Sequence, residues 1–126
     1  MRVHLTAPRG RAARGALAAA LLGSAIALAA ATGATWPWVV AGAAGPDVAL
    51  SLGIGRGLER GQLHPRAVPL DNALHHPAGP VTVLALCAAG VLGAGPAAGA
   101  LAWGAHILMD RAAGYGLRTR DGLQRA

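Results

Sequence analysis

Four apolar stretches, separated by polar or glycine-containing segments, dominate the pattern of this chain. They are rich in alanine, leucine, valine and glycine and cover residues 15–31, 36–54, 80–92 and 97–117. Most approach the roughly 20 residues that an α-helix needs to cross the hydrocarbon core of a bilayer, and the shorter ones would need tilt or local thinning of the bilayer. The pattern predicts an all-α fold, a four-helix transmembrane bundle over residues 15–117.

The positive charges are distributed unevenly around these stretches. All 11 basic residues are arginines, and they lie before the first stretch, in the long connection over residues 55–79, and at or beyond the end of the fourth stretch. The connections near Thr32–Thr35 and Gly93–Pro96 carry no charge. Because short cytoplasmic loops are enriched in Lys and Arg, both termini and the 55–79 connection are predicted to be cytoplasmic. Residues 1–14 are predicted to be a disordered basic leader, and residues 118–126 a basic tail.

The net charge of +6 does not point to nucleic acid. A nucleic-acid surface gathers its basic residues on one face of a recognisable module, whereas these arginines bracket apolar stretches. The expected partners are therefore the lipid bilayer and its anionic headgroups, and no nucleic acid. Four short helices enclose little space, so a transport role would require a homo-oligomer.

The first apolar stretch has two interpretations. Ala19, Gly23, Ala27 and Ala31 recur every four residues, and such a stripe of small residues predicts the face on which another helix packs. A basic start, a short apolar run and small residues near its end are also typical of a cleavable signal peptide. The first interpretation keeps this segment as a helix of the bundle, and the second removes it.

Ionisable residues inside the apolar stretches are the main candidates for function. Asp47 follows Pro46 in the second stretch and lies about 16 Å along a helix from Trp36. A carboxylate near mid-bilayer costs about 2.5–3.5 kcal/mol on insertion scales, so it needs a partner. His106 and Asp110, four residues apart in the fourth stretch, share one helix face, and His106 lies about 15 Å from the start of that stretch.

Further polar residues lie near the same depth. Asn72 and His75 are one helical turn apart at the entrance of the third stretch, and His76 follows. Arg111 is next to Asp110 and is expected to pair with an aspartate. Three segments thus bring a polar cluster to the cytoplasmic half of the bundle, and its expected members are Asp47, Asn72, His75, His106, Asp110 and Arg111.

Three functions fit such a cluster. The favoured one is structural or interactive, in which polar bonds only hold the helices together. The second is a proton- or metal-coupled carrier, and the third a membrane-embedded metal-dependent hydrolase. His75, His106, Asp47 and Asp110 are the candidate metal ligands, and a divalent metal is the only cofactor that this sequence leaves open. No HExxH motif, P-loop or serine nucleophile motif is present.

Nearly the whole sequence, from about Gly15 to Gly122, resembles a known family. The resemblance is carried by Pro46-Asp47, by Asn72-x-x-His75, and by His106-x-x-x-Asp110-Arg111-x-x-Gly114-Tyr115-Gly116-Leu117-Arg118. These strings resemble the signature of the bacterial domain of unknown function family 4260. The resemblance implies a small multi-pass protein of the bacterial inner membrane that keeps its first apolar segment, and it assigns no activity.

The chain departs from that signature at two points. Asp71 stands where the family pattern has tyrosine, and the chain ends without the Thr-His pair that follows the basic turn in the family. If that terminal histidine belongs to a functional cluster, this chain is either impaired or uses His76 instead.

Overall fold

The computed structural model describes residues 8–33 and 35–125, and within them the protein is all-α. This confirms that the fold is all-α, whereas the predicted four-helix transmembrane bundle is not shown, because the described residues contain one helix that could span a membrane. The α-helices are α1 (Pro8–Thr32), α2 (Trp36–Ala44), α3 (Val48–Leu52), α4 (Val68–Leu74), α5 (Ala78–Ala88) and α6 (Ala94–Ala113). Two short 3-10 turns are η1 (Gly45–Asp47) and η2 (Pro65–Ala67).

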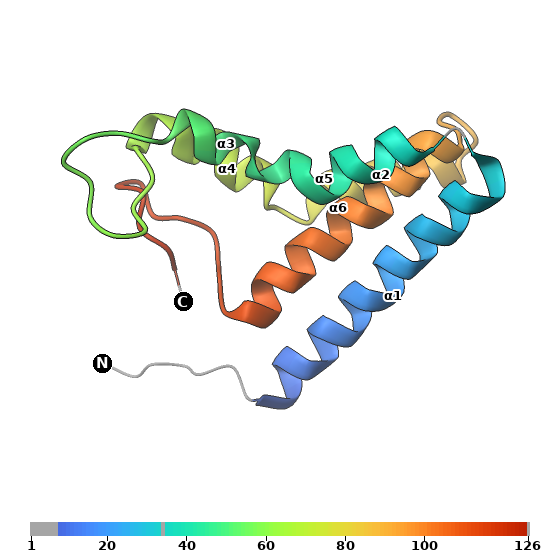
Figure 1. Ribbon diagram of the computed structural model, residues 1–126, viewed down its shortest axis with the longest axis horizontal. Coiled ribbons are helices and arrows are strands. Elements are labelled where there is room, and N and C mark those ends of the chain that lie inside the picture. The colour runs from blue at the N-terminus through green and yellow to red at the C-terminus, as the bar shows by residue number, and fades with distance from the viewer. Residues whose placement is uncertain (1–7, 34, 126) are drawn as a thin grey trace.

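Helix α6 is the centre of the arrangement. It packs against α1, α2 and α5, and α1 runs alongside it over much of its length (Figure 1). The described core consists of small residues that meet where these helices touch: Ala25, Ala29, Val39, Ala98 and Ala102. The closest approach is between α2 and α6, where a Cβ on Gly42 would overlap the carbonyl oxygen of Gly99. Small residues allow such contact because no side chain separates the two backbones.

The packing face of α1 differs from the one predicted. Ala19, Gly23, Ala27 and Ala31 are exposed, whereas Ala18, Ala25 and Ala29 are buried. Alanine fills so many positions of this helix that more than one face is smooth enough for close contact. Helix α6 selects the face that also brings Leu28 against the core. The prediction from the spacing of small residues alone, that the stripe from Ala19 to Ala31 packs against another helix, is therefore wrong.

Several element boundaries also differ from those predicted. Helix α1 begins at Pro8, so residues 8–14 are helical rather than disordered, while the first seven residues of the predicted leader lie outside the described part of the chain. The 36–54 stretch is divided into α2, η1 and α3 because Pro46 has no amide hydrogen to continue an α-helical ladder. Helix α6 ends at Ala113, and Gly114 (φ 97°) supplies the left-handed residue that commonly ends a helix.

The connection and the tail are more ordered than their composition suggests. The 55–79 connection contains η2 and α4, and the tail folds back on itself through a bridge between Arg118 and Gln124. The amide of Leu63 also donates to the carbonyl of Gly122 at 3.0 Å, which attaches the tail to the connection. These two segments form one polar end of the molecule.

One helix among the described residues is long and apolar enough to cross a bilayer, over Arg9–Thr32. Helices α2 and α5 contain 9 and 11 residues and are shorter than a full span of about 20 residues. Helix α6 contains 20 residues, but it carries His106, Asp110 and Arg111 in its last two turns.

Candidate metal centre

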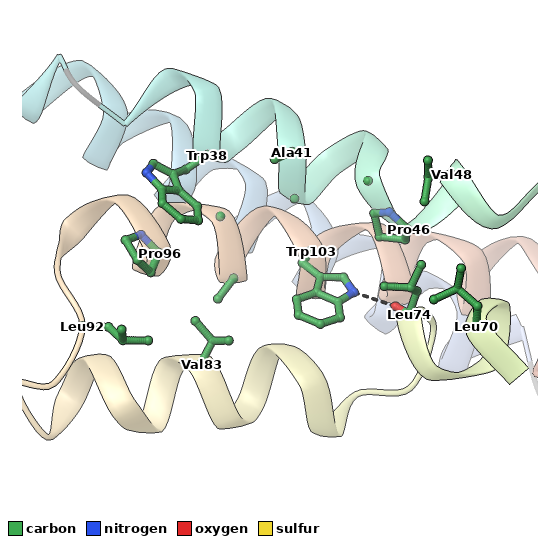
Figure 2. A pocket seen from close by; sticks show the side chains of 14 residues that line it. Trp38, Ala41, Pro46, Val48, Leu70, Leu74, Val83, Leu92, Pro96 and Trp103 are labelled. Atoms are coloured by element: carbon green, nitrogen blue, oxygen red, sulfur yellow. Dashed lines mark hydrogen bonds between the residues drawn. The ribbon is translucent and has the colours of Figure 1, made fainter.

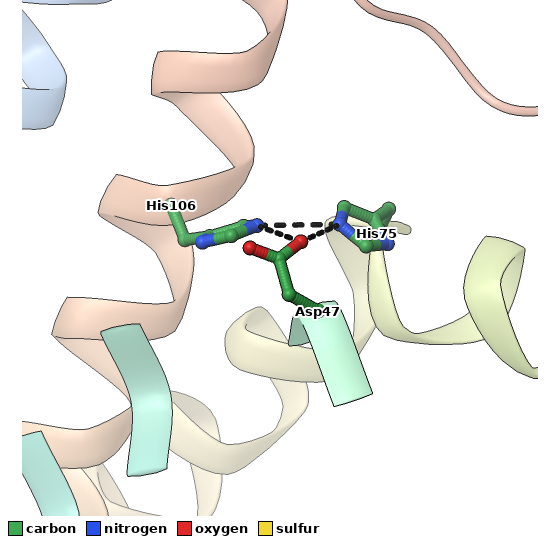
Figure 3. Close-up of side chains that lie close together, drawn as sticks. All are labelled: Asp47, His75 and His106. Atoms are coloured by element: carbon green, nitrogen blue, oxygen red, sulfur yellow. Dashed lines mark hydrogen bonds and ion pairs between the residues drawn. The ribbon is translucent and has the colours of Figure 1, made fainter. Parts of the chain in front are cut away.

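Asp47, His75 and His106 come together from three different elements (Figure 3). The two imidazole Nε2 atoms lie 3.2 Å apart. Asp47 Oδ1 lies 3.4 Å from His106 Nε2 and 3.6 Å from His75 Nε2. Depth counting placed Asp47 and His106 at one level, and their side chains are in contact in the structure.

The local chain geometry leaves the Asp47 carboxylate free for this contact. Pro46 is buried and forms η1, which ends at Asp47. Asp47 then occupies the N-cap position of α3, yet its side chain makes no capping hydrogen bond. Half of the side chain is exposed. The carboxylate can therefore reach both the histidines and water.

Backbone carbonyls orient both histidine rings in the same way. His75 Nδ1 lies 2.8 Å from the carbonyl oxygen of Asp71, and His106 Nδ1 lies 2.8 Å from that of Ala43. A carbonyl oxygen can only accept, so in each ring the Nδ1 atom carries the hydrogen. In the neutral rings both Nε2 atoms then present lone pairs, and they point at one another beside a carboxylate. A metal ion between such facing acceptors would satisfy all of them.

Asp110 adds a second carboxylate to the same pair of nitrogens. Its Oδ2 lies 3.4 Å from His75 Nε2 and 3.6 Å from His106 Nε2. It reaches them because His106 and Asp110 are one turn apart on α6. The Asp110 side chain is about one-third exposed, compared with 12% for His106.

Arg111 and Asn72 do not join this group. Arg111 was expected to pair with an aspartate, but its guanidinium donates to the carbonyls of Tyr115 and His75, each at 2.9 Å. The side chain turns toward the carbonyls left free where α6 and α4 end. Asn72 forms two hydrogen bonds with the backbone of Arg118, donating at 3.0 Å and accepting at 2.7 Å. Through these backbone hydrogen bonds, both residues hold chain segments next to the cluster in place.

The sequence interpretation missed an ion pair that supports the cluster. Arg118 Nε donates to Asp71 Oδ2 at 3.0 Å, and both side chains are buried. Arg118 Nη1 also donates to the carbonyls of Gly61 and Gly122. The sequence places Arg118 in the predicted basic tail, and Asp71 stands out there only as a departure from the family pattern. Two features of the sequence could have indicated this pair. Arg118 is the last residue of the family motif that begins at His106, and Asp71 directly precedes the motif residue Asn72.

The remaining motif residues shape the tail. A Cβ on Gly116 would lie 2.6 Å from the carbonyl oxygen of Arg125, so this position has no room for a side chain. Tyr115 is exposed between the two glycines. His76, the expected substitute for the absent terminal histidine, is exposed and accepts a hydrogen bond from the amide of Ala78 through Nδ1 at 3.1 Å. It therefore caps the start of α5 instead of entering the cluster.

The tail and the cluster enclose a polar cavity of about 270 Å³. Its lining includes Asp47, His75, Asp110, Tyr115, Gly116 and Gln124. Two of the candidate ligands, Asp47 and His75, therefore line a cavity at this end of the molecule.

The comparisons with known proteins identify a family. Residues 15–126 match the family model described as a domain of unknown function, DUF4260. No significant match to the chain is found among the curated proteins or among the solved structures. The match covers all the residues that carry the strings discussed above, and the chain belongs to the DUF4260 family.

Proposed function

We propose that this DUF4260 protein is an integral membrane metalloprotein that binds one divalent ion through Asp47, His75 and His106. The observation that carries the proposal is the triangle of candidate ligand atoms, with edges of 3.2, 3.4 and 3.6 Å. In a tetrahedral zinc site with bonds of about 2.0–2.1 Å, neighbouring ligand atoms lie about 3.3–3.4 Å apart. The side chains therefore need little movement to hold zinc.

The chemistry of the donors also fits a metal. Two imidazoles and one carboxylate suit zinc or another divalent transition metal. Metal-bound histidines usually donate their second ring N–H to a carbonyl or carboxylate, as the Nδ1 contacts of His75 and His106 do. These contacts fix the direction of both lone pairs before the ion binds.

The arrangement supports hydrolysis more than simple metal storage. Three protein ligands leave a fourth position for water, which is the feature that separates catalytic from structural zinc sites. Zinc would activate that water as a nucleophile near neutral pH. Asp110 lies beside the same two nitrogens and would accept the proton that this water releases.

The structural role that the sequence favoured has its own support. The same polar contacts join α6 to the carbonyl of Ala43 in α2 and to His75 at the end of α4. Polar contacts between membrane helices contribute about 0.6 kcal/mol each on average. In this alternative, removing the side chains would lower stability equally with and without metal.

We also propose that all four apolar stretches lie in the bacterial inner membrane, with both termini cytoplasmic. Large apolar side chains are exposed on several helices, among them Leu17, Val40 and Val81. The core contacts of Ala25 and Ala29 support a first helix that is retained. A reporter enzyme inserted after Arg60 should be active only on the cytoplasmic side, and a periplasmic signal would contradict this topology.

Metal analysis tests the proposed centre. The full chain, purified without a histidine tag and dialysed after zinc exposure, should retain about one zinc ion per chain. Asp47→Asn and His106→Ala should each remove stoichiometric zinc. The control His76→Asn changes an exposed histidine outside the cluster and should retain it. Zinc bound equally by all four proteins would overturn the proposal.

A stability measurement separates the metal centre from the structural alternative. An ion at 100 times its Kd stabilises the folded state by about 2.7 kcal/mol, so zinc should raise the melting temperature of the wild type and of His76→Asn. It should leave Asp47→Asn unchanged if this variant folds, as circular dichroism would show. A carrier would instead show zinc or proton flux in liposomes that Asp47→Asn abolishes.

A further inference from the structure

A second cavity, of about 540 Å³, lies next to the candidate metal centre (Figure 2). It is bounded by α2, α4, α5 and α6, and its lining is almost wholly apolar. Trp38 and Pro96 lie toward one end, and Leu70 and Leu74 toward the other. Its volume is within the roughly 300–1,000 Å³ of small-molecule sites.

The apolar cavity and the polar cavity share a wall. Three pairs of consecutive residues divide between the two cavities, with the first residue of each pair lining the apolar one and the second the polar one. The pairs are Pro46 and Asp47, Leu70 and Asp71, and Leu74 and His75. The apolar cavity therefore extends to the chain segments that hold two of the candidate ligands.

Trp103 lines the apolar cavity, and its polar atom is hydrogen-bonded. Its Nε1 donates to the carbonyl of Leu74 at 2.6 Å, directly before His75 in the chain. The side chain of Val83 on α5 completes the opposite wall. The nearly apolar lining is thus suited to a ligand that is apolar along most of its length.

We propose that the apolar cavity binds an acyl chain of a membrane amphiphile whose polar group lies at the metal centre. The inference rests on the proposed metal function and names its ligand class. The occupant must be apolar along its length and polar at one end, because an apolar cavity adjoins a carboxylate–histidine cluster. The proposed membrane location would place such amphiphiles around the chain, which has one helix long and apolar enough to cross a bilayer. Each buried CH₂ of an acyl chain contributes about 0.8 kcal/mol.

Fluorescence quenching by a brominated lipid tests the proposal. The chain has three tryptophans, and the probe protein keeps Trp103 alone through Trp36→Phe and Trp38→Phe. It is reconstituted in vesicles that contain phosphatidylcholine with brominated acyl chains. Bromine quenches tryptophan on contact, so Trp103 fluorescence should be strongly reduced relative to unbrominated vesicles.

Filling the cavity separates binding inside it from contact with bulk lipid. A Cβ on Gly45, which lines the cavity, meets nothing within 4 Å, so Gly45→Leu adds a side chain there without a backbone clash. It should abolish most of the quenching of Trp103. The control Gly23→Leu adds the same side chain to an exposed position of α1 and should leave the quenching unchanged. Gly45→Ala, which disturbs the fold less, should give an intermediate loss.

The outcomes distinguish this proposal from the metal centre. Quenching that Gly45→Leu removes supports acyl binding, whether or not the protein retains zinc. Unquenched Trp103, or quenching that Gly45→Leu and Gly45→Ala leave intact, overturns it even if zinc binds. A shift of oligomeric state in Gly45→Leu, with Trp103 unquenched in the wild type, would assign the cavity to a second copy of this chain and would also overturn it.

Discussion

Helix α6 takes part in two contacts that are built on opposite principles. In its first half, Ala98 and Ala102 meet alanines of α1, and the contact depends on the absence of side chains. In its second half, His106 and Asp110 meet Asp47 and His75, and the contact depends on the position of individual atoms. The first contact is defined by shape and the second by the direction of hydrogen bonds and lone pairs.

The two contacts should respond differently to substitution. Close backbone packing fails when volume is added, because there is no room for it. A buried polar network fails when a partner is removed, because the remaining group keeps its desolvation cost. The following substitutions test this difference, in order of decreasing effect.

Removing one member of the buried Asp71–Arg118 pair should have the largest effect. Asp71→Leu leaves the Arg118 guanidinium buried without its carboxylate and should lower the free energy of unfolding by about 3–5 kcal/mol. Denaturant unfolding in detergent measures the loss. The double variant Asp71→Leu/Arg118→Met removes both charges and should recover part of it. Breaking a buried pair costs about 3–5 kcal/mol. If the free energy of unfolding of Asp71→Leu were within about 1 kcal/mol of the wild-type value, the pair would be effectively solvated.

Adding one methyl group at the α2–α6 contact should have the next largest effect. Gly42→Ala places a Cβ against the carbonyl of Gly99, and such overpacking costs about 1–3 kcal/mol. Alanine is the better helix former by about 1 kcal/mol, so a net loss would isolate the clash. Gly23→Ala, with open space around its Cβ, should be neutral or stabilising. Equal effects of the two substitutions would contradict a close contact at Gly42.

Losing the tryptophan hydrogen bond should have a smaller effect. Trp103→Phe keeps an aromatic ring but leaves the carbonyl of Leu74 without its donor, which should cost about 0.5–1.5 kcal/mol. Trp36→Phe changes an exposed side chain and serves as the control. Thermal unfolding of both variants in the same detergent should show the difference. If Trp36→Phe lowered the stability more than Trp103→Phe, the hydrogen bond between Trp103 and the carbonyl of Leu74 would be contradicted.

The exposed stripe of α1 should tolerate substitution best. Ala27→Leu lies on the face away from α6 and should change the free energy of unfolding by less than about 0.5 kcal/mol. Ala25→Leu lies in the core and should cost about 1–3 kcal/mol. If the two effects were reversed, the face predicted from the sequence would be the one that packs.

The sequence predicted the polar contact better than the apolar one. Histidine and aspartate are rare in apolar stretches, so counting depth along two helices was enough to place Asp47 near His106. Alanine occupies 11 of the 25 positions of α1 and occurs on several of its faces, so its spacing contains little information about which face packs. Which of Ala25 and Ala27 is buried depends on the surface of α6, against which α1 packs.

The buried pair of Asp71 and Arg118 shows a different limit. Both residues lie in segments whose composition indicates a solvated loop and tail. Their burial depends on a tail that folds back after Gly114 and on the contact between Leu63 and Gly122. Such long-range contacts leave no local periodic pattern, and only the family string hinted that Arg118 belongs with the cluster.

X-ray absorption at the zinc edge tests the central claim most directly. The zinc-loaded full chain should show only nitrogen and oxygen neighbours at about 2.0–2.1 Å, with the scattering pattern of two imidazoles. His106→Ala, if it retains any zinc, should show one imidazole fewer. A spectrum with sulfur neighbours at about 2.3 Å, or one without imidazole scattering, would contradict a centre formed by Asp47, His75 and His106.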